Sequence, residues 1–203
     1  MDITQEELDE VLRKHKEFLK GHSDGERAYL YKVNLDHAHL DRANLEGAVL
    51  EGSSFKGAYM RGINLSRANL KKTNLSKAKM SLSNLQGADL NFANMSEVEL
   101  EGSDLSDVDL NHADVRGGNL NRVNLFNSIL DKALFCRANL EGANLCNASA
   151  KCANFVGANL NRSNLEEVNF KKAYMAEAKL NGANLENTDV NDAYLVGIYL
   201  RDN

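Results

Sequence analysis

The chain has 203 residues, of which 43% are hydrophobic, and this is long and apolar enough for a sizeable buried core. It contains no Pro and no Trp, and only 6% of its residues are aromatic, so large aromatic anchors do not hold this core. With 29 acids and 24 bases the formal net charge is −5, which argues against a general electrostatic attraction to nucleic acid or to an anionic membrane.

The first 27 residues predict an amphipathic helix from about residue 4 to residue 20. Thr4 and Glu7 have the spacing of a capping box, and Gly21 supplies the stop. Apolar residues at three- and four-residue spacing form one stripe, which we expect to cover the open end of the structure that follows. Docking of a partner on this helix is the alternative. The residues of this N-terminal cap are Thr4, Glu7, Leu8, Val11, Leu12, Phe18 and Leu19.

The sequence shows no sign of export or of membrane insertion. Its N-terminal segment lacks the basic and then apolar pattern of a signal peptide, and no long apolar run occurs in the chain. We therefore expect a cytoplasmic protein with no membrane segment. Because the net charge is negative, we expect no direct binding to nucleic acid.

From residue 28 onward the sequence has a period of five residues. Every fifth residue from Leu30 to Leu200 is large and apolar, except Ala150, and the residue two positions earlier is small or β-branched, mostly Ala. This period fits neither a helix nor a flat strand, so each unit must turn a corner after a short extended segment. Eleven of the 14 glycines lie two residues after an apolar centre, where a tight corner favours glycine.

Units such as Ala-Asn-Leu-Glu-Gly at 43–47 and Ala-Asn-Leu-Cys-Asn at 143–147 resemble the pentapeptide-repeat family, whose motif is A-(N/D)-L-x-x. The resemblance covers about residues 28–200. It implies an all-β solenoid, namely a right-handed quadrilateral β-helix in which four pentapeptides form one coil. About 35 uninterrupted pentapeptides then give nearly nine coils. The chain is therefore expected to divide into an N-terminal capping helix with its linker (1–27) and a pentapeptide-repeat β-helix (28–203).

Four units per coil place residues that are 20 apart on top of one another. Leu45, Leu65 and Leu85 begin a leucine column that faces inward, and Asn44 and Asn64 begin an outward column whose amides can bond along the rod. Ala150 leaves space in its own inward column. We expect phenylalanine rings to fill this space, either that of Phe170 or those of Phe135 and Phe155, and a small cavity is the alternative.

The four sides of the rod differ in charge. The side that bears Asn44 and Asn64 carries six acids against the single base Arg67, whereas the other three sides are close to balance. We call it the acidic face and expect it to be an interaction surface. Its acids are Glu46, Asp104, Asp107, Glu166, Glu167 and Glu186.

The last units carry aromatic and apolar residues where an exposed strand edge favours pairing with another chain. We expect no second cap after Leu200, and we expect a homodimer through this end. Two tyrosines lying over the last coil without a partner are the alternative. Members of the quinolone-resistance type dimerise through their C-terminal ends, although the extra terminal structure that they carry is missing here. The candidate dimer residues are Tyr194, Val196, Ile198 and Tyr199.

No group of residues predicts catalysis, a cofactor or a metal site. His37, His39 and His112 map to different sides of the rod, and we interpret all five histidines as surface residues. The three cysteines form an odd set without CxxC spacing, so we interpret them as free thiols: Cys136, Cys146 and Cys152. We therefore expect a protein that is not an enzyme.

Three functions remain. The main hypothesis is a non-catalytic scaffold whose flat faces bind another protein. The alternative, implied by the family resemblance, is a DNA-mimicking binder of DNA gyrase or another type II topoisomerase that confers quinolone protection. Its acids are sparse for this role, because duplex DNA carries one charge per about 1.7 Å of its axis. A structural spacer that uses only stiffness and end-to-end contact is the second alternative.

Overall fold

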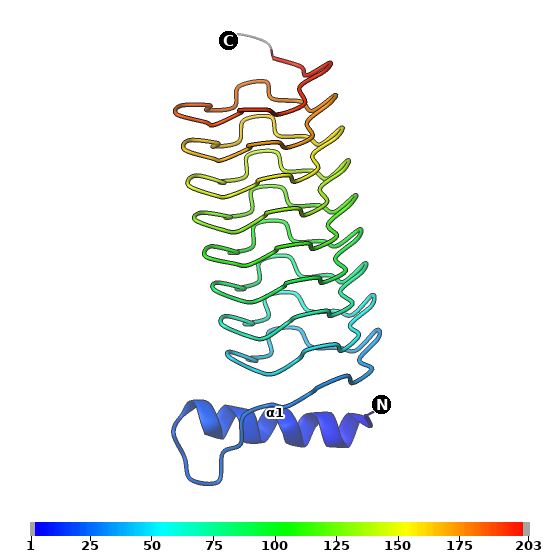
Figure 1. Ribbon diagram of the computed structural model, residues 1–203. Coiled ribbons are helices and arrows are strands. Elements are labelled where there is room, and N and C mark those ends of the chain that lie inside the picture. The colour runs from blue at the N-terminus through cyan, green and yellow to red at the C-terminus, as the bar shows by residue number, and fades with distance from the viewer. Residues whose placement is uncertain (1–2, 201–203) are drawn as a thin grey trace.

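The computed structural model describes residues 3–200, which form helix α1 (Gln5–Leu19) followed by a rod of stacked coils (Figure 1). Each five-residue unit contributes one bridge residue to a parallel ladder. Bridge partners are 20 residues apart throughout, from Tyr29 and Val49 to Lys179 and Tyr199. A coil of 20 residues holds four pentapeptides, so the predicted four-sided solenoid is confirmed.

Every corner of the rod contains a residue in the left-handed region. From Lys32 to Gly197, the residue two positions after each core residue has φ between 54° and 71°. The next backbone N–H donates to the carbonyl of the core residue, as Ala38 does to Leu35 at 3.1 Å. A positive φ at the third residue of such a turn is the geometry of a type II β-turn. Glycine adopts it without steric cost, which explains the glycines predicted at the corners.

The inward positions form one continuous apolar core. The apolar centres from Leu40 to Leu180 are buried, and so are the small residues two positions before them except Ala38 and Ala43, which are half-buried. Helix α1 contributes Leu8 to the same cluster. Ala150 is buried beside an aromatic cluster. The Phe135 and Phe155 rings stack with centroids 4.9 Å apart, and Phe155 meets Phe170 edge to face at 5.4 Å. The three phenylalanine rings therefore pack against one another in this part of the core.

The outward asparagines form hydrogen bonds within the corners and between successive coils. The Asn144 Oδ1 accepts the backbone N–H of Cys146 at 3.2 Å, and the Asn144 Nδ2 donates to the Asn124 Oδ1 at 3.1 Å. The predicted amide ladder is thereby confirmed. Side-chain bonds of this kind also join residues 44 and 64, 104 and 124, 144 and 164, and 164 and 184.

Helix α1 lies across the first coil as a cap (Figure 1). Its predicted capping box is present: the Glu7 backbone N–H donates to the Thr4 hydroxyl, and the Glu7 carboxylate accepts the Thr4 backbone N–H. Leu8 is buried, and Val11 and Leu12 pack against the core. Leu19 is half-buried, whereas Phe18 is 42% exposed and contributes less to the cap than its place in the apolar stripe predicted.

His15 corrects the prediction that all five histidines lie on the surface. Its side chain is fully buried on the side of α1 that covers the first coil, and its Nδ1 accepts the backbone N–H of Ala28 at 3.0 Å. Ala28 begins the first unit of the solenoid. In later units the equivalent backbone N–H donates to the carbonyl of the core residue three positions earlier, as Ala48 does to Leu45, whereas the Ala28 N–H finds its acceptor in the His15 ring. The ring therefore satisfies a backbone donor that the start of the solenoid would otherwise leave unpaired.

At the opposite end, the last coil leaves core positions open to solvent. Leu185 is 37% exposed, Val190 41% and Leu200 53%, although each occupies an inward position. A hollow of about 250 Å³ lies among these side chains and those of the coil before. The C-terminal end of the described residues is therefore an apolar surface.

Candidate functional site

The acidic face is one flat side of the rod, but its acids are not equivalent. Each stands in an outward or corner position of a unit centred on the leucine column that begins at Leu45. The Arg67 guanidinium lies 4.0 Å from the Glu46 carboxylate, so the single base of this side stands beside its most N-terminal acid. The net negative charge therefore lies in the middle and C-terminal coils.

The middle acids take part in the side-chain ladder. Asp104 accepts the Asn124 Nδ2 at 3.0 Å and the Ser106 backbone N–H at 3.0 Å. Asp107 is an exposed corner residue that accepts the Asn127 Nδ2 at 2.7 Å. Both carboxylates are therefore held in place by amides of the neighbouring coil.

Glu166, Glu167 and Glu186 form the densest acidic group of this side. Glu166 and Glu186 occupy equivalent positions in successive coils, and Glu167 is the exposed corner residue beside Glu166. The Cys146 thiol lies in the same column one coil earlier. Burial raises the pKa of Cys146, and the charges of Glu166 and Glu167 raise it further. Cys146 is therefore a poor nucleophile at neutral pH, since its thiolate form is disfavoured.

The structure distributes the four candidate dimer residues over different surfaces. Tyr194 and Val196 lie on the side opposite the acidic face and are 55% and 60% exposed. Tyr199 is 57% exposed on the next side of the rod, whereas Ile198 packs inward against the core. These residues do not form one patch. The inward residues of the last coil that sequence reasoning left out, Leu185, Val190, Leu195 and Leu200, make the apolar end itself.

The described residues contain no group of three or more His, Cys, Asp or Glu side chains that could hold a metal ion. Two exposed histidines stack on aromatic rings of the next or previous coil: the ring centroids are 4.7 Å apart between His39 and Tyr59 and 4.7 Å apart between His112 and Phe92. The three cysteines are free, as predicted. Burial raises the pKa of Cys136, whose thiol lies 3.9 Å from the Asn154 carbonyl.

An open groove that the sequence did not indicate lies on the side of the rod that carries Tyr59. It has a volume of about 840 Å³ and is lined by side chains of both charges, among them Arg61, Lys79, Glu101 and Arg122. Its lining holds three acids and three bases, so the formal charges of the groove cancel. Over residues 3–200, no helix combines the length and the apolar character needed to cross a bilayer.

The chain belongs to the pentapeptide-repeat family, because the model of pentapeptide repeats matches overlapping segments that together run from residue 28 to residue 202. Proteins of this family form right-handed quadrilateral β-helices, and the coil of this chain is therefore right-handed. None of the curated proteins matches the sequence significantly.

Two solved structures show how closely the fold is shared. HetL, a pentapeptide-repeat protein involved in heterocyst differentiation regulation in the cyanobacterium Nostoc sp. strain PCC 7120, is 25% identical with a TM-score of 0.79. The match covers 100% of this chain and 98% of HetL. QnrB1, a plasmid-mediated fluoroquinolone resistance protein, is 17% identical with a TM-score of 0.65, over 86% of this chain and 90% of QnrB1. At this identity the likeness to QnrB1 extends to the fold alone.

Proposed function

We propose that this chain is a non-catalytic scaffold that binds another protein through its acidic face. The observation that carries the proposal is the imbalance of charge on one flat side of the rod. This side has six acids and one base, Arg67, and that base lies beside Glu46. A partner with a basic, elongated surface fits such a side, because complementary charge speeds association and fixes the register of two surfaces.

The backbone under these acids supports the same role. Each coil is hydrogen-bonded to the next, and the asparagine ladder runs along this side through Asn124, Asn144 and Asn164. Side chains on such a lattice are already ordered, so binding costs little further conformational entropy. The carboxylates of Asp107 and Glu166 also accept amides of neighbouring coils, which restricts their rotamers before any partner arrives.

A type II topoisomerase such as DNA gyrase is the second candidate partner. The acidic face supports it, since an acidic rod can occupy a surface that otherwise holds DNA. The fluoroquinolone resistance protein QnrB1 has the same fold, but the similarity concerns the fold and does not extend to individual residues. The charge density of this rod is well below that of duplex DNA, which carries one charge per about 1.7 Å.

The test is a gyrase supercoiling assay, with and without a quinolone, into which the wild-type protein and two triple variants are titrated. The first variant is Glu166→Gln, Glu167→Gln and Glu186→Gln on the acidic face. The matched control is Glu97→Gln, Glu99→Gln and Glu101→Gln, which removes the same charge from exposed positions on other sides. Inhibition or drug protection that only the acidic-face variant loses identifies a topoisomerase as the partner.

If gyrase is unaffected at micromolar protein, the same three proteins serve as baits for affinity capture. The proposal expects a partner that wild type and control retain and that the acidic-face variant loses by about tenfold or more in affinity. A partner that binds all three proteins equally well contradicts a role for the acidic face.

A further inference from the structure

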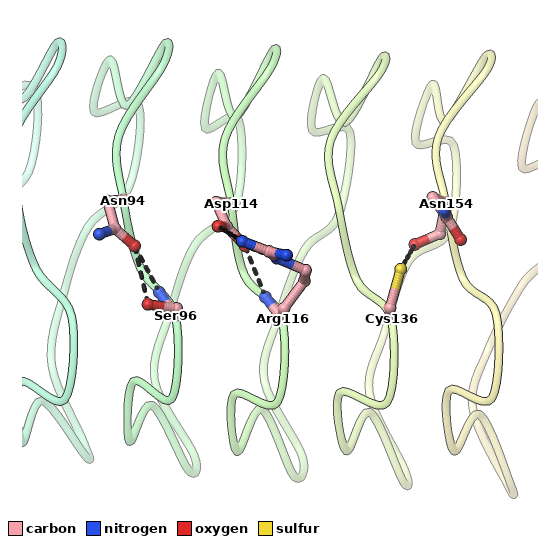
Figure 2. A network of polar contacts seen from close by, with 6 residues as sticks. All are labelled: Asn94, Ser96, Asp114, Arg116, Cys136 and Asn154. Carbon is pink, nitrogen blue, oxygen red and sulfur yellow. Dashed lines mark hydrogen bonds and ion pairs between the residues drawn. The ribbon is translucent and has the colours of Figure 1, made fainter.

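The side opposite the acidic face changes character part of the way along the rod. In the N-terminal coils its outward positions are polar, and Figure 2 shows the boundary, where Asn94 with Ser96 and Asp114 with Arg116 give way to Cys136. Beyond Arg116, Asn154 is the one polar outward residue of this side. The other positions form what we call the apolar strip: Leu134, Cys136, Val156, Tyr174, Ala176, Tyr194 and Val196.

The large residues of the apolar strip in its last two coils are open to solvent, whereas Leu134 and Val156 are half-buried. Tyr174 is 54% exposed, Tyr194 55% and Val196 60%. Tyr59 lies in an equivalent outward position on the adjacent side and is less exposed, at 37%, because the stacked His39 ring and the Lys79 ammonium, 4.5 Å from its centroid, cover part of it. A contiguous exposed apolar patch of this kind marks an interaction surface.

We propose that the apolar strip binds the same strip of a second copy of this chain, with the two rods packed face to face and antiparallel. The strip lies on a flat side of the rod, so its partner must be flat as well. A two-fold axis midway between Asn154 and Tyr174 places all four coils of one strip on all four coils of the other. Such an isologous contact is the commonest symmetry of protein dimers.

Side-chain volumes match in this register. Rotation about that axis sets Tyr194 against Leu134 of the second copy and Tyr174 against its Asn154. In the neighbouring column it sets Val196 against Cys136 and Val156 against Ala176. Every tyrosine then meets a smaller side chain and every valine meets Cys or Ala, so two flat sheets can approach at an even spacing.

Charges at the edges of the strip favour the antiparallel direction. Lys132, Cys152, Lys172 and Asp192 are the corner residues along one edge, and Arg137, Gly157, Glu177 and Gly197 are those along the other. The antiparallel rotation sets Lys132 against Asp192 of the second copy, and symmetry repeats this pair. A parallel face-to-face dimer would instead oppose Lys132 and Arg137, which repel, and Lys172 and Glu177, which attract, so its edge charges cancel. The antiparallel dimer has the attractive pair and no like-charge pair among these corner residues.

The size of the strip predicts a weak dimer. Four coils span about 19 Å along the rod, so the buried surface is smaller than the roughly 800 Å² per partner of a standard stable interface. We therefore expect dissociation in the micromolar range, measured by sedimentation velocity over a concentration series. Wild-type protein that stays monomeric up to about 200 μM overturns the proposal.

Two matched variants separate the strip from the C-terminal end. Tyr174→Glu places a charge in the strip one coil before the last, and we expect it to raise the dimer Kd by at least about 30-fold. Tyr199→Glu changes an equally exposed tyrosine in the last coil, on the adjacent side, and should leave the Kd unchanged. A dimer that Tyr199→Glu dissolves while Tyr174→Glu spares it is an end-to-end dimer, which overturns the strip.

A charge exchange tests the antiparallel direction without touching the apolar residues. Lys132→Glu alone and Asp192→Lys alone should each raise the Kd by about tenfold, because each creates two like-charge pairs across the interface. The double variant should return to within about threefold of wild type. The two residues are three coils, or about 14 Å, apart within one chain, so recovery cannot come from an intramolecular pair. Failure to recover overturns the antiparallel register.

Discussion

Asparagine before a core leucine performs two tasks at once. Its Oδ1 accepts the backbone N–H of the first corner residue, as Asn144 does from Cys146. Its Nδ2 donates to the equivalent side chain one coil earlier, as Asn144 does to Asn124. Aspartate can perform only the first task, because an ionised carboxylate has no donor. The family motif allows either residue, yet the ladder favours the amide.

Exchanging these two residues should therefore change stability in opposite directions. Asn144→Asp removes one side-chain hydrogen bond and should lower the free energy of unfolding by about 0.5–1.5 kcal/mol. Asp104→Asn supplies a donor toward Asn84 and should raise it by a similar or smaller amount. Urea unfolding of the two variants beside wild type measures both shifts. Equal and negligible shifts would mean that the ladder amides gain nothing over water.

Prediction for single residues succeeded where the place of a residue in the five-residue unit decides whether its side chain points into the core or outward. The five-residue period placed Leu45 and its column inward, put the glycines at the corners and stacked Asn44 on Asn64, and the structure confirms each of these. The candidate dimer group was chosen by hydrophobicity and by its place at the C-terminal end, and dimerisation through it stays a prediction. In a pentapeptide, Tyr194 and Tyr199 point outward on different sides and Ile198 points inward, whatever their character.

Helix α1 caps the solenoid with a polar contact at its centre. The buried His15 ring accepts the Ala28 N–H through Nδ1, and backbone contact continues at the linker, where the Glu26 N–H donates to the Lys14 carbonyl at 3.1 Å. Sequence analysis interpreted His15 as a surface residue, because the residue pattern does not distinguish a ring that accepts a backbone N–H of the first coil from one at the surface. That choice depends on which backbone donors the first coil leaves open.

This contact makes the cap sensitive to acid. Burial lowers the pKa of His15 and the Arg27 charge lowers it further, while the Glu46 backbone carbonyl acts in the opposite direction. The unfolded chain therefore takes up a proton at His15 first, near pH 6.5, and the folded chain only at lower pH. Stability that His15 contributes is present at neutral pH and is lost as the pH falls below about 6.5.

A His15→Gln variant separates this effect from other titrations. Glutamine can still accept the Ala28 N–H but does not titrate. We expect the difference in melting temperature between wild type and variant to shift against wild type when the pH is lowered from about 7.5 to about 5.5. A difference that stays constant over this range would show that His15 has the same pKa in both states.

At the scale of the whole molecule, the two proposed surfaces occupy opposite sides of one rod. Packing through the apolar strip leaves the acidic face of each copy pointing outward, so a dimer presents two such faces to its partners. A flat-sided solenoid can separate binding surfaces in this way because its four sides share one core and differ only in their outward residues. The sequence revealed the acidic face through its charge, but the apolar strip appeared only when each coil was assigned its sides.

Because each coil contacts only its neighbours, stability should depend on position along the rod. Leu105 and Leu185 belong to the same inward column, yet Leu105 is fully buried between coils, whereas Leu185 lies in the last coil and is 37% exposed. Leu105→Ala should lower the free energy of unfolding by about 2–5 kcal/mol, since it leaves a cavity in a closed core. Leu185→Ala should cost less than about 1.5 kcal/mol, because solvent already reaches that side chain. Urea unfolding at a concentration where the protein is monomeric compares the two variants. An equal cost would mean that the last coil of the monomer is as closed to solvent as the middle of the rod.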